Sequence, residues 1–168
     1  MGKKVQRYLL MLVLGTMLLV SSSLAVANTV ALVTVLAYVT KPLDCVINNN
    51  QAIEVDFGNE VITTKVDGRN YMQEVKYTLR CSGDTVNTLK LQIQGEPAWF
   101  NPAVLATVQQ RDLGIEIWAD GIILPANSWL NFTYPNVPLL SAVPVKRSGS
   151  TLSAGKFSAA ATMKIDVQ

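Results

Sequence analysis

The chain contains no histidine among its 168 residues. Without an imidazole it cannot form a Ser–His or Cys–His catalytic pair, and it lacks the side chain that titrates near neutral pH. It also lacks the commonest protein ligand of zinc. No glycine-rich phosphate loop and no nucleophile-elbow motif occurs in the sequence. We therefore expect no catalytic residue, no metal site, no cofactor and no enzymatic activity.

Charged residues are also few, at 15% of the chain, and part of the basic charge is confined to the N-terminus. Lys3, Lys4 and Arg7 precede an apolar run from Leu9 to Val20, and Ala25-Val26-Ala27 follows with small residues where signal peptidase needs them. The run is short for a membrane span. We expect residues 1–27 to be a signal peptide cleaved after Ala27; an uncleaved membrane anchor is the alternative.

Removal of this segment abolishes the net positive charge. The chain has 14 basic and 12 acidic residues, and loss of the three basic residues leaves 11 against 12. Binding of nucleic acid requires a concentrated basic face. No nucleic-acid partner is therefore expected.

The sequence has only two cysteines, Cys45 and Cys81, and both follow the predicted cleavage site. An exported chain meets an oxidising compartment, where a disulfide between them is the default. A metal site or a nucleophilic thiol is the alternative, and the absence of histidine makes both less favourable.

The remaining sequence predicts strands rather than helices, because short apolar alternations are separated by turn residues. Residues 71–81 predict one strand, with Lys76 and Arg80 on its wet face. Asp120-Gly121 lies between two apolar runs and predicts a two-residue hairpin. Further alternations and turns are predicted at Leu89–Gln94, Ile115–Trp118, Asp67-Gly68 and Ser82-Gly83-Asp84. Pro125, Pro135 and Pro138 predict a loop or an edge strand. The pattern indicates a single all-β domain, an antiparallel sandwich of immunoglobulin-like type.

The two ends of the mature chain are unusually rich in strand-forming residues. Asn28–Thr40 is apolar and lacks glycine and proline. At the C-terminus, apolar residues alternate with more polar ones up to the last residue: Phe157, Ala159, Ala161, Met163, Ile165 and Val167. A free apolar arm is an aggregation hazard unless another chain's sheet receives it. The alternative is that Asn28–Thr40 forms the first strand of its own sandwich.

Two groups of residues could carry other functions. Glu54 and Asp56 lie two residues apart and could form a catalytic or metal-binding pair, but their alternation with apolar residues favours a solvated strand face. Trp99, Trp118 and Trp129 could stack on sugars, although core or loop packing is the commoner role of tryptophan.

Several motifs together resemble the pilin subunits of chaperone–usher fimbriae, such as type 1 and P pili. They are Cys45-Val46-Ile47-Asn48, Ile53–Gly58, Tyr77–Cys81, Leu113–Ile117 and Ala142–Val145, followed by Gly155 in the fourteenth position from the C-terminus with Phe157 after it. Their order and spacing cover essentially the whole mature chain.

The resemblance implies an incomplete immunoglobulin-like β-sandwich with one disulfide, completed by a donor strand from another chain. Residues 28–40 would then be the N-terminal donor-strand extension and residues 41–168 the pilin domain. The C-terminal strand, Gly155–Gln168, would form one wall of an apolar groove, and Phe157, Ala159, Ala161, Met163, Ile165 and Val167 would face the core side. The implied partners are a periplasmic chaperone, an outer-membrane usher and neighbouring pilin subunits, and the implied location is a fimbria on the cell surface, reached through the periplasm.

Two positions depart from the family pattern. A glycine is usual near the end of the donor strand, and Ala37 stands there; a tyrosine is common next to the last residue, and Val167 stands there. Placing the small Ala37 at the glycine position selects the inserting face of the donor strand, which is Ala31, Val33, Val35, Ala37 and Val39. The opposite register would exchange the two faces of the arm.

The sequence thus predicts a structural subunit that polymerises by donor-strand exchange, of minor or adaptor rank. A two-domain tip adhesin is not expected, because it needs a receptor domain ahead of the pilin domain. A single-domain tip subunit whose tryptophans bind a host glycan is the second hypothesis. The third is a self-complete secreted immunoglobulin-like domain.

Overall fold

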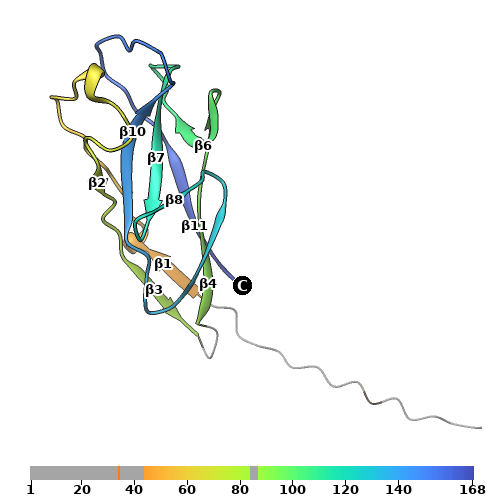
Figure 1. Cartoon of the computed structure of the whole chain (residues 1–168). Coiled ribbons are helices and arrows are strands. Elements are labelled where there is room, and N and C mark those ends of the chain that lie inside the picture. Colours follow the sequence, from red (N-terminus) through yellow and green to blue (C-terminus); the bar gives the residue numbers. More distant parts are fainter. Residues whose placement is uncertain (1–33, 35–43, 84–86) are drawn as a thin grey trace, which may run out of the picture. The chain divides into compact units, whose positions relative to one another are not determined.

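The computed structural model describes residue 34 and residues 44–83 and 87–168 (Figure 1). The predicted signal peptide and nearly all of the predicted donor-strand extension, including Ala31, Val33, Val35, Ala37 and Val39, lie outside the described residues. Within the described part, no helix is long and apolar enough to cross a membrane.

The described residues form β-strands and two single-turn 3₁₀ helices. The strands are β1 (Asp44–Ile47), β2 (Gln73–Glu74), β3 (Leu79–Ser82), β4 (Thr88–Gly95), β5 (Pro97–Ala98), β6 (Asn101–Ala106), β7 (Leu113–Ala119), β8 (Ile122–Leu124), β9 (Trp129–Thr133), β10 (Leu140–Lys146) and β11 (Ala161–Val167). The 3₁₀ helices are η1 (Asn48–Asn50) and η2 (Thr63–Lys65). The predicted all-β class is confirmed.

The strands pair in three antiparallel groups. The largest has the order β2-β10-β7-β6-β5, with β8 also paired to β7. The second has the order β11-β4-β9, and the third joins β1 to β3. Figure 1 shows β10 and β7 as the long central strands, and they pair over seven residues from Leu140↔Ala119 to Lys146↔Leu113. The prolines after the hairpin flank β9, an edge strand that pairs only with β4 among the described strands.

The core lies between the first two sheets and follows the alternation of the sequence. Leu89, Leu91 and Ile93 point inward from β4, while Lys90 and Gln92 are half-buried on its outer side. Leu91 and Ile93 pack in one cluster with Leu105, Ile115, Ile117, Leu140 and Ala142 of the facing sheet. Close packing requires Gly114 in β7, because a Cβ there would lie 2.8 Å from the carbonyl oxygen of Leu105.

The predicted hairpin is confirmed at Asp120-Gly121. Both residues have positive φ, 49° and 81°, and Ala119 pairs directly with Ile122 across the two-residue turn. The turn at Asp67-Gly68 is also confirmed: Asp67 Oδ1 accepts hydrogen bonds from the backbone N–H groups of Arg69 and Asn70.

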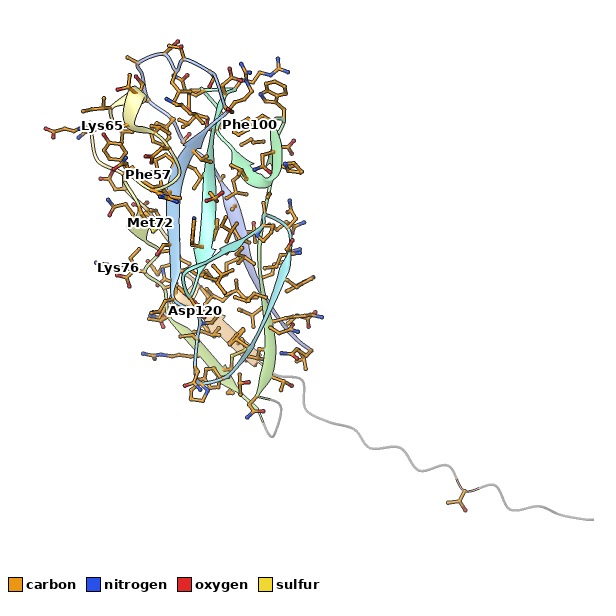
Figure 2. The ribbon with its side chains drawn as sticks, in the orientation of Figure 1. Phe57, Lys65, Met72, Lys76, Phe100 and Asp120 are labelled. Carbon is orange, nitrogen blue, oxygen red and sulfur yellow. A yellow bond between two sulfur atoms is a disulfide. The ribbon has the colours of Figure 1, made fainter. Side chains whose placement is uncertain are left out.

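The prediction of a single strand at residues 71–81 is wrong in one respect. The segment forms two strands, because its backbone changes partner along its length: β2 pairs with β10, and β3 pairs with β1. The alternation persists through the change, with Leu79 buried and Lys76 and Arg80 exposed. Figure 2 shows Lys76 extending away from the ribbon.

The C-terminal strand is shorter than the predicted Gly155–Gln168. Strand β11 begins at Ala161, which pairs with Gly95, the last residue of β4. Before that point no strand continues opposite the chain, so Ser158 bonds instead to the loop after β6. Its carbonyl accepts a hydrogen bond from Val108 N–H, and its own N–H donates to Gln109 Oε1.

The predicted disulfide joins Cys45 of β1 to Cys81 of β3. These two residues are direct partners in the register of the two strands, with Cα atoms 4.0 Å apart. The bond therefore fastens the small third sheet.

Tyr77 anchors the stretch between β2 and β3 to the loop before β10. Its hydroxyl donates a hydrogen bond of 2.7 Å to the carbonyl oxygen of Pro138. Burial, with a smaller contribution from the charge of Asp120, raises the pKa of Tyr77 to about 12. Asp120 also holds the loop, since its Oδ1 accepts a hydrogen bond from Leu139 N–H.

A pH dependence follows from the raised pKa of Tyr77. An unfolded tyrosine ionises near pH ~10, whereas the folded phenol stays protonated up to pH about 12. The folded state therefore holds more protons in that window, so this contribution to stability is complete below pH ~10 and is lost as the pH rises through about 12. We expect Tyr77→Phe to lower the unfolding free energy at neutral pH by about 1 kcal/mol, because the hydrogen bond is lost. The unfolding free energy of this variant should also fall less steeply as the pH rises into the alkaline range.

Urea unfolding of the protein, with an added peptide of residues 28–40 as donor strand, measures this difference between about pH 8 and 12. Tyr134→Phe is the matched control, since it removes one phenol elsewhere. An equally steep decline in the Tyr77→Phe variant and the wild type would contradict the assignment.

Candidate functional site

An apolar groove of about 700 Å³ opens between the first segment of the domain and its C-terminal strand. Its first wall contains Ile47, Asn50, Gln51, Ala52, Ile53, Val55 and Phe57; its second contains Phe157, Ser158, Ala159, Ala161, Thr162 and Met163; its floor contains Val75, Ile93, Leu105, Ile115, Ile117, Leu140 and Ala142. None of these side chains is ionisable. The groove therefore offers apolar burial and backbone pairing rather than acid–base or metal chemistry.

The first wall is an extended segment without a strand partner. Ile53, Val55 and Phe57 point inward and are half-buried, whereas Glu54 and Asp56 are exposed. The two carboxylates therefore lie on the solvent side, as the alternation predicted. Among the described residues, no backbone–backbone hydrogen bond joins residues 53–57 to another segment. These N–H and C=O groups are free to pair with an added strand.

The second wall is built by the residues that lead into β11. Phe157, Ala159, Ala161 and Met163 line the groove, and the Phe157 ring packs against Phe57 of the opposite wall with centroids 5.9 Å apart. Strand β11 pairs with β4 on one side and with no other described strand. The groove is thus bordered by a second free edge.

The other predicted C-terminal residues lie elsewhere. Ile165 packs against the core cluster, and Val167 is half-buried beyond the groove. Gly155 is exposed with a φ of 149°, in a turn before the wall begins.

The floor residues were not predicted as part of a site. They come from β4, β6, β7, β10 and the segment after β2. The predicted alternations marked Val75, Ile93, Ile115 and Ile117 as inward-facing. The sequence held no signal to tell which inward residues would stay uncovered.

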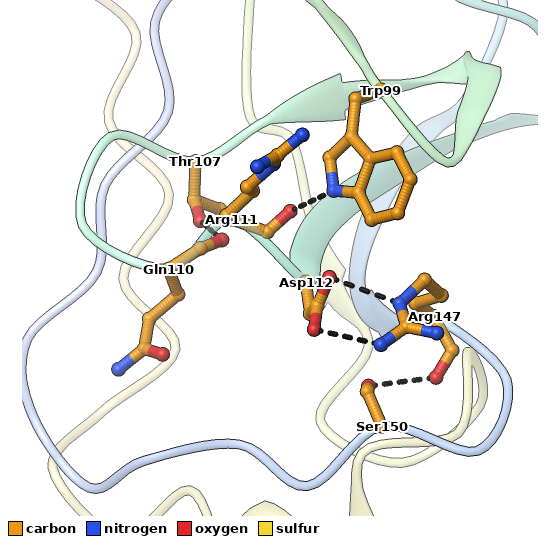
Figure 3. Close-up of polar contacts among 7 residues, drawn as sticks. All are labelled: Trp99, Thr107, Gln110, Arg111, Asp112, Arg147 and Ser150. Atoms are coloured by element: carbon orange, nitrogen blue, oxygen red, sulfur yellow. Dashed lines mark hydrogen bonds and ion pairs between the residues drawn. The ribbon is translucent and has the colours of Figure 1, made fainter.

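A second, polar pocket of about 360 Å³ surrounds Trp99 (Figure 3). Trp99 is 56% exposed, and its Nε1–H donates a hydrogen bond of 3.0 Å to the carbonyl oxygen of Arg111. The Arg147 guanidinium binds both Asp112 carboxylate oxygens, at 3.0 and 3.1 Å. This pairing, more than the neighbouring Trp99 and Arg111, holds the pKa of Asp112 below its usual value.

The other two tryptophans lie apart from this pocket. Trp129 is 43% exposed, and the Lys90 ammonium lies 5.1 Å from its ring centroid. Trp118 is half-buried and donates its Nε1–H to Glu116 Oε1.

A model of the fimbrial protein family matches residues 33–168. The chain belongs to the fimbrial protein family. It is 41% identical to the fimbrial-like protein YfcR of Escherichia coli strain K12 over 134 residues, which cover 77% of this chain and 76% of that protein. The predicted membership is confirmed, and this family of structural proteins is not enzymatic.

Solved pilus structures share the fold of this fimbrial protein. The P pilus rod subunit PapA has a TM-score of 0.59 and 22% identity, over 74% of this chain and 99% of its own. A chain from the structure of a chaperone–usher pilus has a TM-score of 0.53 and 20% identity, over 87% of this chain and all of its own. The predicted immunoglobulin-like pilin fold with one disulfide is confirmed.

Proposed function

We propose that this fimbrial protein is a structural subunit of a chaperone–usher fimbria, and that its groove accepts a donor strand from another chain. One observation carries the proposal: an apolar groove lies between two extended segments whose facing edges have no partner among the described strands. Backbone groups on both edges can pair with an inserted strand, and alternate side chains of that strand can enter the groove.

The composition of the groove supports an apolar strand as its occupant. Burial of one large aliphatic side chain stabilises by roughly 1.5–3 kcal/mol, so several such side chains offset the cost of ordering an extended arm. The predicted arm, residues 28–40, supplies small and branched apolar residues at alternate positions. The inserting set is Ala31, Val33, Val35, Ala37 and Val39.

The same groove explains the proposed partners and location. Before assembly the exposed floor would aggregate, so a periplasmic chaperone fills it with a strand of its own. At an outer-membrane usher, the arm of the next pilin subunit replaces that strand, and the subunit enters a fimbria on the cell surface. We propose a minor rank for the subunit within such a fimbria.

Deletion of residues 28–40 tests whether the chain donates as well as accepts a strand. We expect the truncated subunit to form a soluble complex with its periplasmic chaperone, because the groove lies in residues 47–163. We also expect it to be absent from the groove of a preceding subunit, since it has no arm to donate. Co-purification with the chaperone and incorporation into fibres measure the two outcomes separately.

The self-complete domain predicts a different result. If residues 28–40 are its own first strand, the truncated protein loses part of its fold. If they are not needed for the fold, the truncated protein stays folded and monomeric without any chaperone or donor peptide. A folded, monomeric truncated protein under those conditions would falsify the incomplete-fold proposal.

A further inference from the structure

We propose that the pocket beside Trp99 binds an acidic sugar residue, a pyranose ring that carries a carboxylate. The pocket shares no lining residue with the apolar groove. The proposal is therefore independent of strand acceptance, and either can fail without the other.

The indole of Trp99 presents a fixed flat surface at the rim of this pocket. Its Nε1–H is held by the Arg111 carbonyl, and the Phe100 ring meets it edge-on at a centroid distance of 6.3 Å. The residue is nevertheless 56% exposed. Such a pre-set aromatic surface suits the C–H face of a pyranose, which is apolar while its edges are polar.

The charge of the pocket selects an anion. The guanidinium groups of Arg111 and Arg147 both lie over the Trp99 ring, with Cζ atoms 4.7 and 5.6 Å from its centroid. Asp112 neutralises Arg147 through two hydrogen bonds. Within the described ranges, no carboxylate lies within 4.0 Å of the Arg111 guanidinium. The Arg111 guanidinium is therefore left without a carboxylate partner. Its planar geometry can bind a carboxylate through two parallel hydrogen bonds.

The remaining lining matches the hydroxyl groups of a sugar. Thr151 and Ser153 border the pocket from the segment between β10 and β11. Gln110 is positioned by the hydrogen bond from its Nε2 to the Ser153 carbonyl oxygen. The volume of about 360 Å³ is near the lower end for ligand pockets, so it suits one sugar ring better than a long peptide.

Titration of the mature protein, with its groove filled by an added peptide of residues 28–40, tests the proposal. Methyl glucuronide is the ligand and methyl glucoside is its neutral counterpart. We expect saturable binding of the glucuronide and at least about tenfold weaker binding of the glucoside, because only the acid pairs with Arg111. The affinity should fall as salt is added. Isothermal calorimetry measures both ligands.

Single substitutions assign the binding to this pocket. Arg111→Gln removes the unpaired charge and leaves the Arg147–Asp112 pair intact, so we expect an affinity at least about tenfold lower for the glucuronide. Trp99→Ala should lower it similarly, and Trp99→Phe should lower it less. Trp129→Ala and Lys90→Gln are matched controls, since they alter the other exposed tryptophan–cation pair and should leave binding unchanged.

Several results would overturn the proposal. They are the absence of saturable glucuronide binding, equal binding of the glucoside, equal competition by inorganic sulfate alone, or unchanged affinity in the Arg111→Gln variant. If Arg111→Gln and Trp99→Ala spare glucuronide binding but impair fibre assembly, the pocket is a contact between subunits instead of a sugar site.

Discussion

Replacement of Ala161 by arginine is expected to abolish the entry of this subunit into fibres. Ala161 begins β11, lines the groove and is exposed to solvent in the open domain. An arginine there can reach water while the groove is empty. Once a strand enters, the guanidinium must be buried among apolar residues without a partner, which costs several kcal/mol, or more than about 100-fold in binding.

The adjacent Ala160 provides the matched control. It is also exposed and is not among the groove-lining residues, so Ala160→Arg adds the same side chain outside the groove. We expect Ala160→Arg to keep wild-type assembly, while Ala161→Arg loses both the chaperone complex and the fibre-bound protein. Quantification of each variant in periplasmic extracts and in sheared fimbriae measures this. Normal fibre incorporation of the Ala161→Arg variant would show that the donor strand lies elsewhere.

Removal of the disulfide by the double change Cys45→Ser and Cys81→Ser has the second-largest expected effect. The bond closes a loop with a sequence separation of 36 residues and fastens β1 to β3. Among the described strands, this pair has no further strand partner, so no third strand holds β1 and β3 together when the covalent bond is lost. We expect the free energy of unfolding to fall by about 3–4 kcal/mol.

Urea unfolding of the mature protein, with its groove filled by an added peptide of residues 28–40, measures this loss as a fall in midpoint of about 1 M or more. Wild-type protein treated with a reductant is the control, and it should approach the double variant. An unchanged midpoint in the variant would mean that the sheet of β1 and β3 is held by packing alone. The effect also bears on function, because the η1 turn that follows β1 contributes Asn50 to the groove wall.

The C-terminal segment shows what local pattern determines and what tertiary structure determines. The alternation of Phe157, Ala159 and Met163 predicted their inward orientation, and all three line the groove. The same pattern extended the strand back to Gly155, where the structure has none. Side-chain periodicity reports which face is apolar, while a strand also needs a partner, and β4 ends at Gly95 opposite Ala161.

The sequence by itself determined the all-β class, the Asp120-Gly121 hairpin, the disulfide and the inward faces of the strands. Each of these depends on residues close in sequence or on the chemistry of a residue type. Only the tertiary structure decided which inward faces stay uncovered and where residues 73–82 change their strand partner. It also decided that the side chains of Arg111, Arg147 and Trp99 lie together. These features depend on contacts between segments distant in the chain, and a groove exists only where such segments fail to cover one another.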